Sequence, residues 1–168
     1  MGSRDDFDVD VAAHPFLLAL SEHHVRLLAD CAVRVVFESG QIIFREDETA
    51  NRFYLIERGE IVLESTTAGG AAIAIDTIRD GDLLGWSWLF SPYVWRFTAR
   101  ATKPTTAIFF YGTILREYCE KDHTLGYELL KRMSAVMTRR LQSARARFVE
   151  AQSGFPPVGS EHAMGVGA

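Results

Sequence analysis

The sequence predicts a mainly β domain, a sandwich or barrel of about seven or eight short strands, with helices at both ends. Two observations predict this fold class. Short apolar segments separated by turn residues recur roughly every 8–12 positions through the middle of the chain, which is typical of sandwiches and barrels. Residues 123–149 then change to apolar side chains every three or four positions, without proline, which predicts one long helix.

The N-terminal part is expected to differ from the strand-rich centre. Residues 1–12 are polar, with four aspartates, and are expected to be flexible. Residues 13–30 are predicted to be helical, because apolar side chains recur near helical spacing and Ser21 followed by Glu22 can start a helix.

The strands follow from an apolar period of two that begins at Val33, interrupted by turns rich in glycine and aspartate. Gly69-Gly70 is a hairpin turn between two such segments. A short helix is expected at 111–120, and the Gly-, Pro- and Ala-rich residues 151–168 are expected to be disordered. The folded domain is therefore predicted to span 13–150. Its expected strands lie near 33–37, 42–44, 53–56, 61–63, 73–78, 98–101 and 106–110.

Composition excludes several classes of protein. Apolar residues make up 48% of the 168 positions and the formal net charge is −4, so no global charge favours nucleic acid. No apolar run approaches the ~20 residues of a membrane span, and the N-terminus lacks a basic signal-peptide start. Two distant cysteines, Cys31 and Cys119, favour a reducing, cytoplasmic location.

Catalytic and metal-binding motifs are missing from the sequence. It contains no glycine-rich phosphate loop, no nucleophile elbow and no His/Cys set at metal-ligand spacing. The histidines at positions 14, 23, 24 and 123 are expected at the surface. We therefore expect neither an enzyme nor a metalloprotein.

Three segments resemble the cyclic-nucleotide-binding domain family: FESGQIIFRE at 37–46, FYLIERGEI at 53–61 and IRDGDLLG at 78–85. The resemblance runs from about residue 14 to residue 148. It implies a β-roll or jelly roll of about eight antiparallel strands, with an N-terminal helix, a short helix in the phosphate-binding cassette and a long C-terminal helix. Crp/Fnr-like regulators of this family add a helix-turn-helix after the long helix, whereas only about 18 residues follow it here, so the DNA-reading part is expected to be absent.

The cassette of this family has a Gly-Glu step that opens a short helix, and an Arg that pairs with the cyclic phosphate. In the ungapped register Gly85 is kept, Trp86 stands at the Glu position and Trp95 at the Arg position. Phe97 stands near a position that is usually small, and Arg96 is one place off, on the opposite face of an extended strand. The candidate ligand-binding residues are Gly85, Trp86, Ser87, Trp88, Trp95, Arg96, Phe97 and Thr98.

Aromatic residues are concentrated in this cassette: they fill six of the twelve positions 86–97, including all three tryptophans. Three interpretations stay open. The rings plug the pocket as core, they form a repurposed pocket for a small flat ligand, or Gly85, Ser87 and Arg96 retain binding of cyclic AMP or cyclic GMP.

The long helix carries one apolar stripe, which predicts a homodimer, with packing on the chain's own barrel as the alternative. Its predicted dimer contacts are Leu129, Met133, Val136 and Met137. The helix is also basic, so it is either a solvated face or a surface for an acidic protein or a nucleic acid. Its basic residues are Lys131, Arg132, Arg139, Arg140, Arg145 and Arg147.

Together these features predict a regulatory, non-catalytic signal-transduction module with altered or weak cyclic-nucleotide binding. A ligand at the cassette would shift the long helix and thereby a protein effector. The alternatives are a dimeric interaction module with an aromatic-plugged pocket, and a Crp/Fnr-like transcriptional regulator that lacks its own DNA-binding domain.

Overall fold

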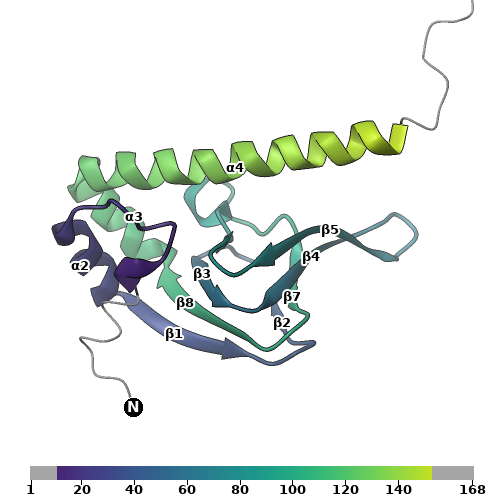
Figure 1. Ribbon diagram of the computed structural model, residues 1–168, viewed down its shortest axis with the longest axis horizontal. Helices are drawn as coiled ribbons and strands as arrows, with labels where there is room; N and C mark the ends of the chain where they lie inside the picture. The colour runs from purple at the N-terminus through teal and green to yellow at the C-terminus, as the bar shows by residue number, and fades with distance from the viewer. Residues whose placement is uncertain (1–10, 153–168) are drawn as a thin grey trace, which may run out of the picture. The chain divides into compact units, whose positions relative to one another are not determined.

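Two four-stranded antiparallel sheets form the centre of the domain (Figure 1). The computed structural model describes residues 11–152. One sheet has the order β1 (Ala32–Phe37), β8 (Thr105–Tyr111), β3 (Arg52–Arg58) and β6 (Leu83–Leu84). The other has the order β2 (Ile42–Phe44), β7 (Thr98–Ala101), β4 (Glu60–Thr66) and β5 (Ala72–Arg79). The predicted β-roll of eight strands with flanking helices is confirmed.

The hairpin between β4 and β5 forms where the sequence predicts it. Gly70 adopts a φ of +81°, which glycine reaches without steric cost, and the Thr67 N–H donates to the Ala71 carbonyl across the turn at 2.8 Å. The two strands then pair from Thr66 opposite Ala72 to Glu60 opposite Arg79, with one register shift.

Strand β3 is buried on both faces, as its continuous apolar run from Phe53 to Ile56 suggests. Tyr54 and Ile56 belong to the core between the sheets, whereas Phe53 stacks on Phe110 with ring centroids 4.7 Å apart. The buried members of the core between the sheets are Phe37, Ile43, Phe44, Ala50, Tyr54, Ile56, Ile61, Leu63, Ile78, Leu84, Trp95, Ala99, Ala101 and Ala107.

The other face of β3 is covered by helical segments. Helix α3 (Gly112–Lys121) contacts β3, β8 and the short 3-10 helix η1 (Ser87–Leu89), and its Leu115 is fully buried. Phe16, from the N-terminal segment, meets Phe53 edge-on at 6.4 Å. Strand β3 therefore separates two packed layers, one between the sheets and one beneath the helices.

The helix predicted over 13–30 is interrupted. Residues 11–13 are helical, 14–19 form turns, and helix α2 (Glu22–Asp30) starts anew at Ser21, whose hydroxyl accepts from the His24 N–H at 3.2 Å. Pro15 offers no N–H to continue the first helix, and the His14 ring accepts from the Phe16 N–H instead, at 3.2 Å.

Helix α4 (His123–Gln152) confirms the long C-terminal helix. The Asp122 carboxylate accepts from the N–H groups of Thr124 and Leu125 and so caps its start. The helix runs two residues into the segment predicted as a tail; residues 1–10 and 153–168, predicted to be flexible, lie outside the described residues. The chain divides into two compact units between Arg132 and Met133, inside this helix.

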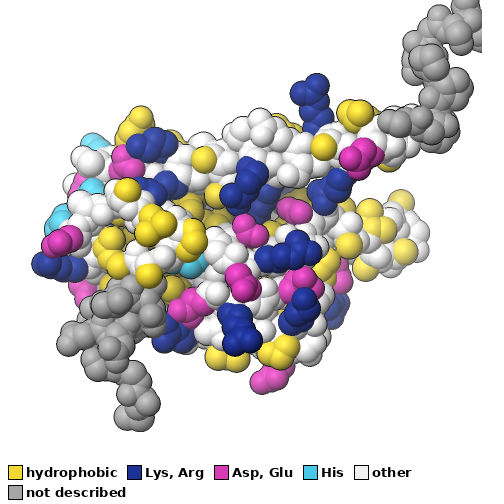
Figure 2. Space-filling model, viewed as in Figure 1, with side chains coloured by type: hydrophobic (Ala, Val, Ile, Leu, Met, Phe, Trp, Pro, Cys, Tyr) yellow, Lys and Arg dark blue, Asp and Glu magenta, His cyan; other side chains and the backbone are white. Residues whose placement is uncertain are grey.

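The visible surface over the strands carries cationic and anionic side chains in a mixed pattern (Figure 2). Among the helices of residues 11–152, none has the length and apolar character needed to cross a membrane. Both cysteines are free thiols, and burial raises the pKa of the Cys31 thiol to about 11.

Candidate functional site

Trp95 lies inside the β-roll rather than at its mouth. Its side chain is 2% exposed and stacks on Phe44, with ring centroids 3.8 Å apart and planes inclined by 12°. Two backbone hydrogen bonds fix the residue: its N–H donates to the Glu48 carbonyl, and its carbonyl accepts from the Asp47 N–H, both at 2.9 Å. The indole therefore forms part of the core between the sheets.

Gly85 makes room for this indole. A Cβ atom built on Gly85 would lie 2.7 Å from the Trp95 ring, and the residue has a φ of +85°. Both the backbone conformation and the contact require glycine here. Gly85 and Trp95, ten positions apart in the chain, are thus brought into direct contact.

Trp88 occupies the other layer. Its side chain is fully buried on η1 and stacks on Phe53 at 5.5 Å. Gly112, at the start of α3, approaches so closely that an added Cβ would lie 2.9 Å from the Trp88 Cβ. The short helix expected in the phosphate-binding cassette is present as η1, and Trp88 packs between it and α3.

Arg116 strengthens this junction between the cassette and α3. Its guanidinium donates a hydrogen bond to the Trp88 carbonyl. The same group lies over the Tyr93 ring, 4.7 Å from the centroid, which is cation–π distance. One side chain of α3 therefore holds both η1 and the loop that follows it.

The remaining candidate residues are less enclosed. Trp86 and Ser87 are half-buried, Phe97 packs partly against the core between the sheets, and Arg96 is exposed. The Thr98 hydroxyl accepts from the Glu46 N–H at 3.1 Å. The structure thus brings Gly85, Trp95 and Phe97 to the inner layer and places Arg96 on the surface.

Sequence reasoning missed two residues of the inner layer. Phe44 provides the stacking face for Trp95. Arg52 shares a face of β3 with Tyr54 and Ile56. It donates to the Ile43 carbonyl at 3.4 Å, and its buried Nε has no hydrogen-bond partner within the described part of the chain. The sequence does carry a signal for this residue, because alternate positions of a strand share one face. Arg52 is two positions before Tyr54 and four before Ile56, so it is expected on the same inward face.

Two of the histidines predicted at the surface are buried. The His14 ring nitrogen Nε2 lies 3.1 Å from the Ile56 carbonyl, and burial lowers the pKa of His14. His24 lies 2.9 Å from the Asp122 carboxylate, which connects α2 with the start of α4. Both partners are remote in sequence, which is why the local pattern did not reveal them. Within residues 11–152, no three His, Cys, Asp or Glu side chains gather as metal ligands would.

The apolar stripe of α4 changes character along the helix. Leu129 and Met133 are buried, and Val136 and Met137 are half-buried. Leu141 and Phe148, further along, are 71% and 66% exposed. The predicted dimer contacts therefore fall mainly on the less exposed part of the stripe.

Comparison with known proteins gives one consistent result. The family model of the cyclic nucleotide-binding domain matches residues 34–122. The cAMP-dependent protein kinase regulatory subunit of Schizosaccharomyces pombe is 32% identical over 71 residues, which cover 42% of this chain and only 16% of that protein.

Solved structures agree with this match. A protein described as a cyclic nucleotide-binding protein from Geobacter metallireducens GS-15 superimposes with a TM-score of 0.71 and 27% identity, over 84% of this chain and 99% of that one. The catabolite activator protein of Thermus thermophilus superimposes with a TM-score of 0.65 and 20% identity, over 82% of this chain and 63% of that one. The second likeness shows the fold alone.

Proposed function

Because the chain belongs to the cyclic nucleotide-binding domain family, we propose that it is a regulatory, non-catalytic module in which Trp95 fills the space that a nucleotide would need. The observation that carries this proposal is the buried stack of Trp95 on Phe44, with Gly85 in close contact with the edge of the same indole. Cyclic AMP and cyclic GMP then bind weakly, because the indole must leave the core before either can enter.

The charge available for a phosphate supports the same conclusion. By its resemblance to the family, the cassette would need an arginine at position 95, and an indole offers one neutral N–H donor instead. Arg96 is exposed and follows a buried residue. Loss of a buried arginine–phosphate pair costs several kcal/mol, which weakens affinity by about a thousandfold or more.

The regulatory output is proposed to pass through α3. Arg116 of α3 contacts both the Trp88 carbonyl and the Tyr93 ring. A rearrangement of η1 would therefore displace α3 as well. Helix α4 starts immediately after α3, at the Asp122 cap. A partner protein that reads α4 would therefore sense the state of the cassette.

We test this function by thermal-shift titration with cyclic AMP and cyclic GMP. Wild-type protein is expected to show no saturable shift at micromolar nucleotide. The double substitution Trp86→Glu with Trp95→Arg restores the family's residues at both cassette positions and is expected to gain a nucleotide-dependent shift. The matched control Arg96→Ala leaves the core intact and should behave as wild type. A saturable micromolar shift in wild type that Arg96→Ala abolishes would contradict the proposal.

Homodimerisation through α4 is part of the proposed function. It is supported by the exposed apolar side chains Leu141 and Phe148, which lie on the stripe that begins with Leu129. Sedimentation of wild type is expected to show a dimer that Leu141→Arg dissociates, whereas Arg145→Ala on the same helix should have no effect. A wild-type monomer at all concentrations would contradict this part.

A further inference from the structure

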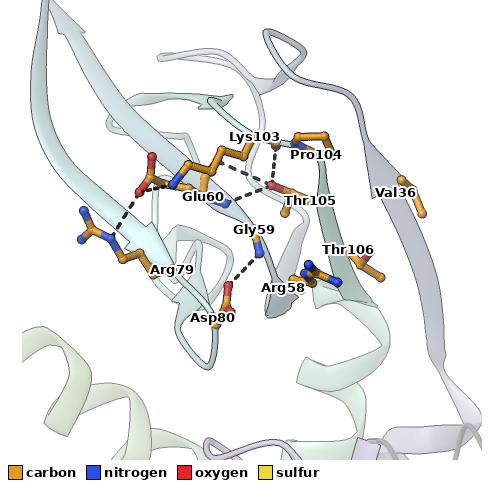
Figure 3. Close-up of a pocket in the computed structure, with 10 residues that line it drawn as sticks. All are labelled: Val36, Arg58, Gly59, Glu60, Arg79, Asp80, Lys103, Pro104, Thr105 and Thr106. Atoms are coloured by element: carbon orange, nitrogen blue, oxygen red, sulfur yellow. Dashed lines mark hydrogen bonds and ion pairs between the residues drawn. The ribbon is translucent and has the colours of Figure 1, made fainter.

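A recess lies at the turns of the β-roll and shares no residue with the cassette (Figure 3). Three connections line it: the tight turn between β3 and β4, the end of β5, and the loop between β7 and β8, together with Val36 of β1. Its volume is about 830 Å³, within the range of small-molecule sites.

The floor of this recess is fixed by close packing. Gly59 has a φ of +125°, and a Cβ built on it would lie 2.3 Å from the Thr105 hydroxyl oxygen. The Gly59 N–H donates to the Asp80 carboxylate at 2.7 Å, and the Thr105 hydroxyl donates to the Lys103 carbonyl at 2.9 Å. The three connections are thus tied together, and the recess is formed in advance of any ligand.

Glu60 organises two of the three cations in the lining. Its carboxylate accepts from the Thr102 hydroxyl at 3.0 Å and from Lys103 Nζ at 3.3 Å, and it pairs with Arg79 Nε at 3.3 Å. These hydrogen bonds, that from Thr102 first, lower the pKa of Glu60, so the carboxylate stays charged at neutral pH. Glu60 therefore holds Lys103 and Arg79 at the recess while using only part of their donor capacity.

Arg58 is the third cation of the lining, and Glu60 does not pair with it. Its guanidinium is exposed beside Thr106, and it has no hydrogen-bond or ion-pair partner among the described residues (Figure 3). The lining holds three cationic side chains and two carboxylates, and Asp80 is already engaged by the Gly59 N–H. One positive charge, with a fork of N–H donors suited to a planar or tetrahedral anion, is therefore uncompensated.

The recess also has an apolar wall. Val36 is 63% exposed on β1, where it pairs with Thr106 of β8, and Pro104 is exposed in the loop between β7 and β8, directly after Lys103 (Figure 3). Exposed valine and proline next to an uncompensated arginine suit a ligand with an apolar body and an anionic end. We propose that this recess binds a small organic phosphate ester, with its phosphate on Arg58 and Lys103 and its apolar part against Val36 and Pro104.

The test uses the full chain and phenyl phosphate as the probe, followed through backbone amide signals in ¹⁵N NMR spectra at low ionic strength. Saturable changes in amide chemical shift are expected at Gly59, Lys103 and Thr106. Arg58→Gln should weaken binding about tenfold, the loss of one charge-assisted contact. Arg96→Gln removes an exposed cation of the cassette and should leave the affinity unchanged. Because the recess shares no residue with the cassette, Trp95→Ala should also leave the affinity for phenyl phosphate unchanged. The experiment can therefore refute this site without refuting the proposed function, and the reverse.

Two further probes define the ligand class. Inorganic phosphate lacks an apolar body and should bind more weakly than phenyl phosphate; equal affinity would overturn the role of the Val36 and Pro104 wall. Benzoate keeps the ring and has a singly charged carboxylate, and it should also bind more weakly. Benzoate binding as tight as phenyl phosphate would overturn the choice of phosphate. Signals that do not change at millimolar phenyl phosphate, or an Arg58→Gln variant that binds like wild type, would overturn the site itself.

Discussion

Trp88 and Trp95 are both buried in the cassette, yet they lie on opposite faces of β3. Trp95 stacks on Phe44 in the core between the sheets, where its ring also touches Gly85. Trp88 stacks on Phe53 beneath the helices and is held by Arg116 of α3. The difference separates two roles within one short segment: one indole occupies interior space, and the other connects that segment to the helices.

The largest expected effect comes from removing the filling indole. Trp95→Ala should lower the free energy of unfolding by about 3–5 kcal/mol, because a large buried ring leaves a cavity between the sheets. Denaturant unfolding measures the loss. An apolar cavity of this kind also binds flat apolar molecules, so free indole should raise the midpoint of the variant and not that of wild type. A loss below about 1 kcal/mol would show that Trp95 does not fill the core.

Gly85→Ala tests the same buried indole by crowding it rather than by removing it. The new methyl would lie 2.7 Å from the ring, so overpacking should destabilise the fold. Gly40→Ala is a matched control, because Gly40 has nearly the same φ, +86°, with nothing within 4 Å of an added Cβ. Gly85→Ala should cost about 1–3 kcal/mol more than Gly40→Ala, and Trp95→Ala in the same chain should remove that excess. Equal costs for the two glycines would contradict the contact.

Arg116→Ala tests the helix-facing side alone. It leaves the Trp88 carbonyl without its donor and removes the cation from the Tyr93 ring, at a cost of about 1–2 kcal/mol. Arg26→Ala, at an exposed helix position, is the control and should change stability little. The response of Trp95→Ala to indole should be unchanged by Arg116→Ala. Loss of that response would show that the two layers are not independent.

The sequence predicted the β-roll well because its signals are local. Glycine at the β4–β5 turn and the alternating apolar residues of β1 and β4 define those elements within a few positions. Strand β6 was missed, since Leu83 and Leu84 are too few to show a period. The strand expected near 98–101 forms there as β7, and the Trp95 backbone before it bonds to Glu48 and Asp47 outside the β7 ladder.

The candidate site was less predictable because its contacts are long-range. The sequence identified Gly85, Trp88 and Trp95 as unusual, but not which face of β3 each indole would occupy. That outcome depends on Phe44 and Phe53, which lie 35 or more positions earlier in the chain. The burial of His14 depends likewise on the Ile56 carbonyl, 42 positions away.

The smallest expected effect concerns acid, and it distinguishes the helix-facing layer from the core between the sheets. Hydrogen bonds from the Leu125 N–H and then from His24 lower the pKa of Asp122 below its ordinary value of 3.8. A carboxylate with a depressed pKa in the folded state adds stability that is fully present above the ordinary value and is lost as pH falls through the depressed one.

Asp122→Asn keeps a side chain that caps helices well and removes only the charge. The stability difference between wild type and this variant should shrink as the pH falls below about 4. The inner layer offers a contrast, because no Asp or Glu side chain of residues 11–152 is buried there. Chemical denaturation at stepped pH would reveal the trend, and a difference at the lowest accessible pH as large as that at pH 5 would contradict the role assigned to the Asp122 charge.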